Sequence, residues 1–211
     1  MNVSGFVKLP PPRTRGDLSL EETLINRRSR RYFQTSPLTP SEISQILWAA
    51  YGLKEPARGK RFSGKANRNC PSAGALFPLE IYLTVGDIVD IPSGFYQFIP
   101  DEHALKLIHD KDLREDLCKA AQQREMVRDA PASLIYIAIE SRVIARYGER
   151  GVQRYIPMDI GHSAQNVYLQ VEALGLGTCA IGAFNDETVK QVLDLPEEQI
   201  PMYIMPVGYP V

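Results

Sequence analysis

The sequence has few of the residues that identify metal sites and hydrolytic enzymes. Its 211 residues include three cysteines and three histidines, and no Cys-x-x-Cys, His-x-x-x-His or Gly-x-Ser-x-Gly motif. These absences leave no support for a zinc site, a dithiol redox centre or a hydrolase triad, and we expect no metal. Cys70, Cys118 and Cys179 are widely spaced, so we expect them to be buried small apolar residues in a reducing compartment.

The sequence also lacks an excess of charge and a long apolar run. Its 24 Lys and Arg residues are balanced by 25 Asp and Glu residues, which argues against a dedicated nucleic-acid binder. No segment reaches the roughly 18 uninterrupted apolar residues of a membrane span, and the N-terminus has no apolar signal-peptide core. We therefore expect a cytoplasmic protein with no membrane anchor.

The chain length suits one domain. Residues 1–18 are basic and contain Pro10–Pro12, which predicts an extended arm that is mobile or lies on a neighbouring surface. In residues 19–211, helical and strand patterns alternate, which predicts one domain with an α+β or α/β sandwich around a mixed sheet.

Local patterns predict the positions of the helices and strands. Helices are expected at 19–28, 40–52, 111–128, 159–174 and 186–193, and strands at 79–85, 94–98, 103–107, 133–140 and 202–207. Asp159 is expected to cap the fourth helix and Gly175 to end it. Residues 133–140 are almost continuously apolar, so this strand should be covered by helices on both faces. Tyr168 and Leu169 extend the apolar surface of the fourth helix, which predicts burial between subunits.

Two segments come close to nucleotide-binding motifs, but each lacks a required feature. Residues 59–66 have the spacing of a phosphate-binding loop, but Ala66 replaces the Ser or Thr that would hold magnesium. Gly175 and Gly177 follow a predicted helix, whereas the dinucleotide fingerprint follows a strand. The sequence therefore favours neither nucleotide hydrolysis nor a Rossmann site.

The segment from Arg27 to Arg31 holds four guanidinium groups and the hydroxyl of Ser29. A solvated charged helix end is one explanation, because cations are favourable near a helix C-terminus. Arginine at all four charged positions instead favours bidentate recognition of a phosphate. In an extended segment Arg27, Ser29 and Arg31 would share one face.

Two segments are rich in small residues, namely 71–78 and 175–184. Each could be a tight surface turn. Small side chains also let the backbone approach a flat ligand closely, with amide groups free to hydrogen-bond it.

Together, and in this order, these segments resemble the nitroreductase-like flavoprotein family, most closely its SagB-type dehydrogenase branch. The resemblance covers about residues 20–209 and depends on segments 25–33, 37–38, 47–52, 71–80, 146–150, 159–162, 165–166 and 175–178. It implies an FMN-dependent oxidoreductase of the α+β class, with a three-layer α/β/α sandwich around a mixed, mainly antiparallel sheet. It also implies an intertwined homodimer with two flavins at the subunit interface.

The resemblance assigns cofactor contacts by position. The phosphate and ribityl chain of FMN would meet Arg27, Arg28, Ser29 and Arg31. The partner subunit would place against the flavin Pro71, Ser72, Ala73, Gly74, Ala75 and Leu76. The isoalloxazine would face Ile181, Gly182 and Ala183, with further ring or ribityl contacts from Gln123 and Asn166.

In such an enzyme the flavin takes a hydride from NAD(P)H and passes it to a small-molecule acceptor, so no side chain has to act as a nucleophile or base. The basic loop 54–69 is expected to attract an anionic donor or substrate through Arg61, Lys65 and Arg68. Tyr147 is a candidate proton donor. Azole-forming members of the SagB branch have a Lys-Tyr pair where this chain has Arg146 and Tyr147, and a guanidinium is too basic to act as a base at neutral pH.

Two alternative functions remain open. The chain could be a SagB-type azoline dehydrogenase that acts on a modified peptide supplied by a partner protein. It could also be a flavin-binding or regulatory protein of this fold with little turnover.

Overall fold

The computed structural model describes residues 5–54 and 68–211. Its middle layer is a seven-stranded sheet in the order β1-β4-β3-β2-β5-β7-β6. The strands are β1 (Phe6–Lys8), β2 (Leu79–Val85), β3 (Gly94–Ile99), β4 (Ala104–His109), β5 (Ala132–Ile139), β6 (Gly177–Thr178) and β7 (Gln199–Gly208). Every pair of neighbouring strands is antiparallel. The α+β class is confirmed, while the expected mixed sheet is antiparallel in all its described strand pairs.

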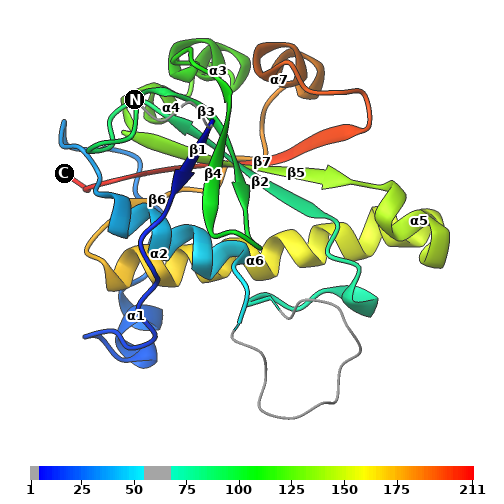
Figure 1. Ribbon diagram of the computed structural model, residues 1–211, viewed down its shortest axis with the longest axis horizontal. Coiled ribbons are helices and arrows are strands. Elements are labelled where there is room, and N and C mark those ends of the chain that lie inside the picture. The colour runs from blue at the N-terminus through cyan, green and yellow to red at the C-terminus, as the bar shows by residue number, and fades with distance from the viewer. Residues whose placement is uncertain (1–4, 55–67) are drawn as a thin grey trace.

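Helices cover both faces of this sheet (Figure 1). They are α1 (Leu20–Asn26), α2 (Pro40–Tyr51), α3 (Arg114–Ala120), α4 (Glu125–Asp129), α5 (Ser141–Tyr147), α6 (Ile156–Ala173) and α7 (Asp186–Leu193). A 3₁₀ turn, η1 (Ala73–Ala75), precedes β2, and a π-helical turn, η2 (Gly151–Tyr155), leads into α6. In Figure 1, α1, α2 and α6 lie below the sheet, and α3, α4 and α7 lie above it. In the described ranges no helix is both long and apolar enough to cross a membrane.

Strand β5 explains why two cores form. Leu134 and Tyr136 point into the core shared with α2 and α6, whereas Ile135 and Ile137 point into the core shared with α3 and α7. Because successive side chains of a strand point to opposite faces, a strand covered on both sides must be apolar at nearly every position. The prediction of helices on both faces is therefore confirmed.

Helix boundaries follow local signals in most places. The capping boxes at Ser19 and Thr39 are both formed. Gly175 adopts a left-handed conformation, with φ of 70°, at the end of α6. Helix α1 ends at Asn26 because Arg27 leaves the helical region, with φ of −52° and ψ of 124°. The helix predicted through Arg28 is thus shorter, and the arginine-rich segment follows it.

Three expectations about helices were wrong. The helix predicted at 111–128 is split into α3 and α4, because Gln122 and Gln123 adopt left-handed backbone conformations. Asp159 does not cap α6, which begins one turn earlier at Ile156, so Asp159 lies inside the helix and is buried. Helix α5 has no counterpart among the predicted helices.

The described part of the expected N-terminal arm lies on its own domain. Strand β1 pairs with β4 at one edge of the sheet, and Leu9 after it is buried. Further along, the side chain of Gln45 accepts a hydrogen bond from the backbone N–H of Arg13 at 2.8 Å and donates one to its carbonyl at 3.1 Å. These contacts hold the arm against α2.

Candidate functional site

The arginine-rich segment is held against the C-terminal half of α6 by Tyr168. The Oγ of Ser29 lies 3.1 Å from the Oη of Tyr168, and the guanidinium of Arg27 stacks over its ring at 5.3 Å. The same Oη accepts a hydrogen bond from the backbone N–H of Ala180 at 2.8 Å. Tyr168 therefore connects the arginine-rich segment to the small-residue segment that follows β6.

The four arginines of this segment have no counter-ions in the part of the chain that the structure describes. None of Arg27, Arg28, Arg30 and Arg31 forms an ion pair there with a carboxylate. The Nε of Arg30 is buried without a hydrogen-bond partner. In a chain with nearly equal numbers of acidic and basic residues, four unpaired guanidiniums within five residues favour an anion site over a merely solvated helix end.

Arg31 also lines a cavity of about 170 Å³ with Ile181, Gly182 and Ala183. Ile181 is buried and exchanges backbone hydrogen bonds with Ile204, while Gly182 and Ala183 are exposed. A short segment that is bridged to β7 through Ile181 thus presents a small-residue surface beside a guanidinium. We call residues 27–31 and 181–183, with the cavity between them, the arginine half-site.

Arg124 lines the same cavity and was missed by the sequence analysis. It follows Gln123, which is exposed in the left-handed turn between α3 and α4. The break in the predicted helix brings Arg124 to this cavity. No local sequence signal marked that break, because glutamine ordinarily favours a helix.

The segment before β2 forms a strained loop at the other end of α6. Gly74, Ala75 and Phe77 all have positive φ, of 61°, 53° and 48°. Such a conformation costs about 1 kcal/mol or more for a residue other than glycine, and strain of this kind is concentrated at functional sites. Ser72 closes the loop, because its Oγ accepts a hydrogen bond from the backbone N–H of Phe77 at 2.9 Å.

The buried carboxyl of Asp159 ties this loop to α6. Its Oδ2 accepts a hydrogen bond from the Oγ of Ser72 at 2.5 Å, and it also accepts one from the backbone N–H of Ala73. Asp159 is 3% exposed. Burial raises the pKa of this carboxyl, and the two hydrogen bonds and the nearby His162 oppose the rise.

A cavity of about 360 Å³ opens beside the same loop. It is lined by Pro71, Ser72, Ala73, Tyr155, Met158, Asp159 and His162. We call this cavity and residues 71–77 the loop half-site. Of residues 71–76, which were predicted to lie against the flavin, Pro71, Ser72 and Ala73 line this cavity. Tyr155 and His162 were not predicted to line it, and Asp159 was predicted only to cap the helix.

Tyr147, the candidate proton donor, lies at the loop half-site. A Cβ placed on Gly74 would stand 2.6 Å from the Oη of Tyr147 and 3.0 Å from the Nη1 of Arg146. The ring of Tyr147 meets that of Tyr155 edge-on, with centroids 4.9 Å apart. Glycine at position 74 therefore leaves room for the hydroxyl of Tyr147 against the loop backbone.

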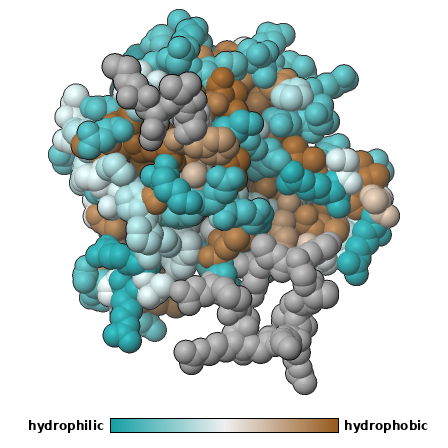
Figure 2. All heavy atoms as spheres, viewed as in Figure 1, coloured by the Kyte–Doolittle hydropathy of each residue, from teal (hydrophilic) through white to brown (hydrophobic). Residues whose placement is uncertain are grey.

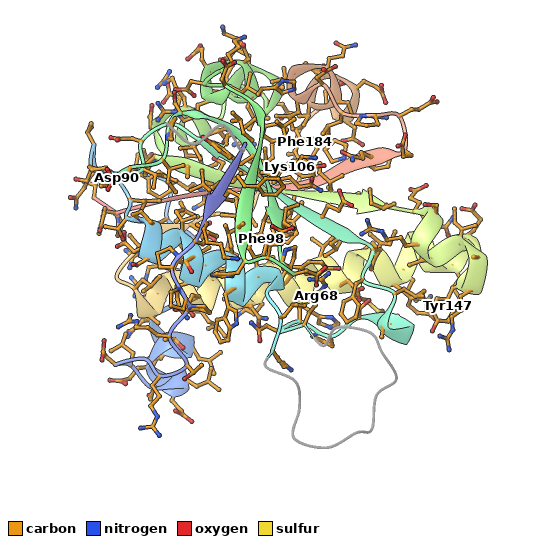
Figure 3. All side chains as sticks on the ribbon, viewed as in Figure 1. Arg68, Asp90, Phe98, Lys106, Tyr147 and Phe184 are labelled. Atoms are coloured by element: carbon orange, nitrogen blue, oxygen red, sulfur yellow. The ribbon has the colours of Figure 1, made fainter. Side chains whose placement is uncertain are left out.

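The expected substrate contacts lie only partly within the described residues. Arg61 and Lys65 fall outside them. The guanidinium of Arg68 stacks over the rings of Tyr51 at 4.5 Å and Phe77 at 5.3 Å, and it donates a hydrogen bond to the carbonyl of Tyr51. Arg68 therefore helps to hold the strained loop through its contact with Phe77. Figure 3 shows Arg68 and Tyr147 on either side of this loop.

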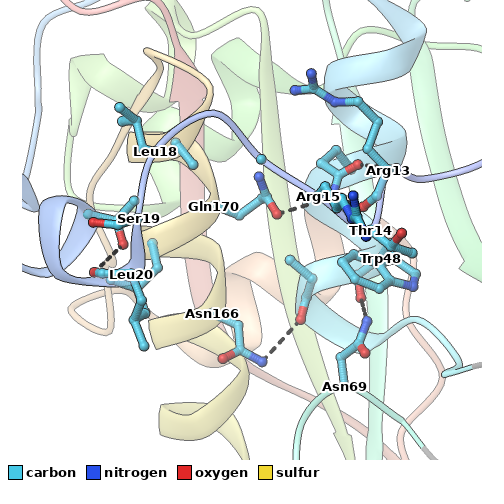
Figure 4. A pocket seen from close by; sticks show the side chains of 16 residues that line it. Arg13, Thr14, Arg15, Leu18, Ser19, Leu20, Trp48, Asn69, Asn166 and Gln170 are labelled. Carbon is cyan, nitrogen blue, oxygen red and sulfur yellow. Dashed lines mark hydrogen bonds between the residues drawn. The ribbon is translucent and has the colours of Figure 1, made fainter.

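Asn166 lies at a third cavity, which neither half-site includes. It lines a cavity of about 310 Å³ between the N-terminal arm, α2 and α6, and its amide donates to the carbonyl of Ala49 at 3.2 Å (Figure 4). A single chain therefore does not bring Asn166 together with the loop half-site or with Arg31.

The two half-sites contact opposite ends of one helix. Ser72 contacts Asp159, whereas Ser29 contacts Tyr168, nine residues further along α6. At 1.5 Å per residue, this spacing is about 14 Å along the helix axis. In Figure 1, α1 and the segment after it lie at one end of α6, and η1 lies near the other.

The chain is similar to known proteins over nearly its whole length. The family model that matches it is that of the nitroreductase family, over residues 24–209. A protein of Methanocaldococcus jannaschii, provisionally named a nitroreductase, is 42% identical over 192 residues, which are 91% of each chain. The FMN reductase (NADPH) of Bacillus subtilis is 36% identical over 196 residues, which are 90% of this chain and 65% of the Bacillus protein. A solved structure from Ralstonia eutropha, also provisionally named a nitroreductase, has a TM-score of 0.82 at 27% identity, covering 99% of this chain and 90% of that one.

The raised pKa of Asp159 predicts how stability depends on pH. The ordinary pKa of the carboxyl is 3.8, and the folded chain binds this proton more tightly than the unfolded chain does. The stabilising contribution is therefore complete below the ordinary value and is lost as pH rises through the raised value. Asp159→Asn has no such proton, so the free energy of unfolding of the wild type should fall relative to this variant as pH rises above the ordinary value of 3.8.

Urea unfolding of both proteins across this pH range measures the difference. A difference that stays constant, or that grows in favour of the wild type as pH rises, would contradict the assignment of a raised pKa to Asp159.

Proposed function

The chain belongs to the nitroreductase family, and on that basis we propose that it is an FMN-dependent oxidoreductase. It transfers hydride through the bound flavin between NAD(P)H and a small-molecule acceptor. The observation that carries this proposal is the arginine half-site, where unpaired guanidiniums meet a surface of small residues. The similarity to a protein named FMN reductase (NADPH) supports the same cofactor and donor.

The donors of the arginine half-site fit the chemistry of FMN. A phosphate dianion is best held by forked, always charged guanidiniums and a hydroxyl, which Arg27, Arg31 and Ser29 supply. Arg28 is a fourth candidate donor, on the same short segment. The exposed backbone of Gly182 and Ala183 leaves space for a flat ring beside Ile181. When bound, FMN supplies the hydride chemistry, and the protein binds and orients it.

The loop half-site that completes each flavin site comes from a second copy of the chain. One chain holds its two half-sites about 14 Å apart along α6. The family resemblance places the loop residues against the flavin of a partner chain. Large apolar side chains are also left exposed on α1 and α6, namely Leu20 (59%), Leu24 (52%), Ile25 (81%) and Met158 (50%). Viewed as in Figure 1, apolar patches interrupt the polar surface (Figure 2). Exposed apolar side chains clustered on α1, with another near the start of α6, favour burial in a homodimer.

Each chain's own residues then have distinct tasks. Ser72 and Asp159 hold the loop backbone at Ala73 and Gly74, which would lie against the flavin of the partner. The hydroxyl of Tyr147, beside Gly74, is the proposed proton donor to a reduced acceptor. Gln123 and Asn166 stay predicted flavin contacts. Arg61, Lys65 and Arg68 stay predicted substrate contacts, and the SagB-type branch stays a prediction as well.

A visible absorption spectrum of the purified protein tests this function. The protein should show a bound flavin that bleaches under anaerobic conditions when NADH or NADPH is added. A bound flavin that neither donor reduces would favour the azoline dehydrogenase or the binding protein instead. A colourless protein that does not take up FMN would refute the proposal.

A double substitution, Arg27→Gln with Arg31→Gln, tests which residues hold the phosphate. Each charge-assisted hydrogen bond contributes about 1.5–3 kcal/mol, so the Kd for FMN should rise by roughly two orders of magnitude or more. Lys106→Gln is the matched control, because Lys106 is an exposed cation on β4, away from both half-sites. Flavin fluorescence titration measures both. Equal affinity in the double variant and the control would show that the phosphate binds elsewhere.

A further inference from the structure

A row of arginines borders the loop half-site. Arg142, Arg146, Arg150 and Arg154 recur every four residues along α5, the turn after it and η2. All four are exposed. Helix α5 lies at the same end of the molecule as η1 (Figure 1). In the sequence, segment 146–150 was part of the family resemblance and Arg146 marked a departure from a Lys-Tyr pair, but no anion site was predicted here.

Two of these guanidiniums lie beside residues of the loop half-site. The Nη1 of Arg146 lies 3.0 Å from the point where a Cβ of Gly74 would be. The Nε of Arg150 donates to the Oη of Tyr155 at 3.4 Å, and Tyr155 lines the cavity. Gly148, with φ of 56° and ψ of −154°, turns the chain between them.

The charges on the row are not balanced by its surroundings. Arg142 pairs with Glu80 and donates a hydrogen bond to the carbonyl of Phe77, so its guanidinium already has partners within the protein. Among the described residues, no carboxylate pairs with Arg146, Arg150 or Arg154.

Besides Glu80, which pairs with Arg142, and Glu140, which precedes α5, two acids of the described residues lie close to the row in sequence or in space. Glu149 is exposed within the row itself, and Asp159 is buried and bonded to Ser72. Within residues 5–54 and 68–211, Arg146, Arg150 and Arg154 against the exposed carboxylate of Glu149 give this stretch a net positive charge.

We propose that Arg146, Arg150 and Arg154 form an anion site that holds the phosphate or carboxylate group of the molecule that reacts at the flavin. The proposal rests on the proposed function. Guanidiniums bind both anions bidentately, and the neighbouring side chains of Tyr155 and Met158 offer an apolar surface to a flat uncharged ring. The ligand class is an organic anion with a planar part. The phosphates of a nicotinamide dinucleotide and the carboxylate of an aromatic substrate share this chemistry.

The test uses the full chain with its flavin content recorded, and compares wild type with the double variant Arg150→Gln and Arg154→Gln. Isothermal titration measures binding of NADP⁺, of 4-nitrobenzoate and of the uncharged 4-nitrobenzyl alcohol, at low salt. The Kd of at least one anionic probe should rise about tenfold or more, because two charge-assisted contacts are lost. The Kd of the uncharged probe should not change, and added salt should shrink the difference. Loss of NADP⁺ binding alone identifies a phosphate, and loss of 4-nitrobenzoate binding alone identifies a carboxylate.

Two further variants sharpen the test. Glu149→Gln removes the acid within the row, so it should tighten binding of the same anionic probe even if the double variant folds poorly. Lys106→Gln removes a distant exposed cation and should leave all three affinities unchanged.

Several results would overturn the proposal. These are a wild type that binds neither anion at low salt, unchanged affinities in the double variant, and an equal loss for the uncharged probe. Loss of FMN from the double variant would also overturn it, because the row would then hold the flavin phosphate. Failure of the wild type to take up FMN refutes the proposed function instead, and anion binding to the row is still measured on that protein.

Discussion

Helix α6 is the constraint on which the rest of the site depends. Its 18 residues extend for about 27 Å, and its buried face packs under the sheet through Ile160, Val167 and Val171. Asp159 near its start holds the strained loop, and Tyr168 near its end holds the arginine-rich segment. A rigid helix packed along its length fixes the distance between these two groups. We therefore propose that the flavin site is shared, with one half from each of two chains.

The ends of α6 carry features that are individually unfavourable. A buried carboxyl, two residues other than glycine in left-handed conformations, and clustered arginines that pair with no carboxylate of the described residues all lie near them. The two cores on either face of β5 supply stability elsewhere, so the fold tolerates these features. Such locally unfavourable features are expected at a ligand-binding surface, because the bound ligand supplies the interactions that the protein alone lacks.

Sequence patterns predicted the structural features that are determined by residues close together in the sequence. The capping boxes at Ser19 and Thr39, and the apolar strand covered on both faces, rest on local chemistry or on a simple period. Structural features that are determined by contacts between residues far apart in the sequence were not predictable. The pattern around Asp159 suits a helix cap equally well, and only its contact with Ser72, 87 positions away, identifies it as an anchor for the loop. The left-handed turn at Gln122 and Gln123 likewise contradicts the helix preference of glutamine.

A mixed dimer tests the division of the site most directly. One chain carries Arg27→Gln and Arg31→Gln, which remove the phosphate donors, and the other carries Ala73→Trp, which fills the cavity of the loop half-site. With distinct tags on the two chains, the mixed dimer is isolated and its flavin content is measured by absorbance. Each variant alone should retain almost no FMN, whereas the mixed dimer should hold about one FMN, because one of its two sites has both halves intact. A mixed dimer without flavin, or a flavin-loaded wild-type monomer, would contradict a site shared between two chains.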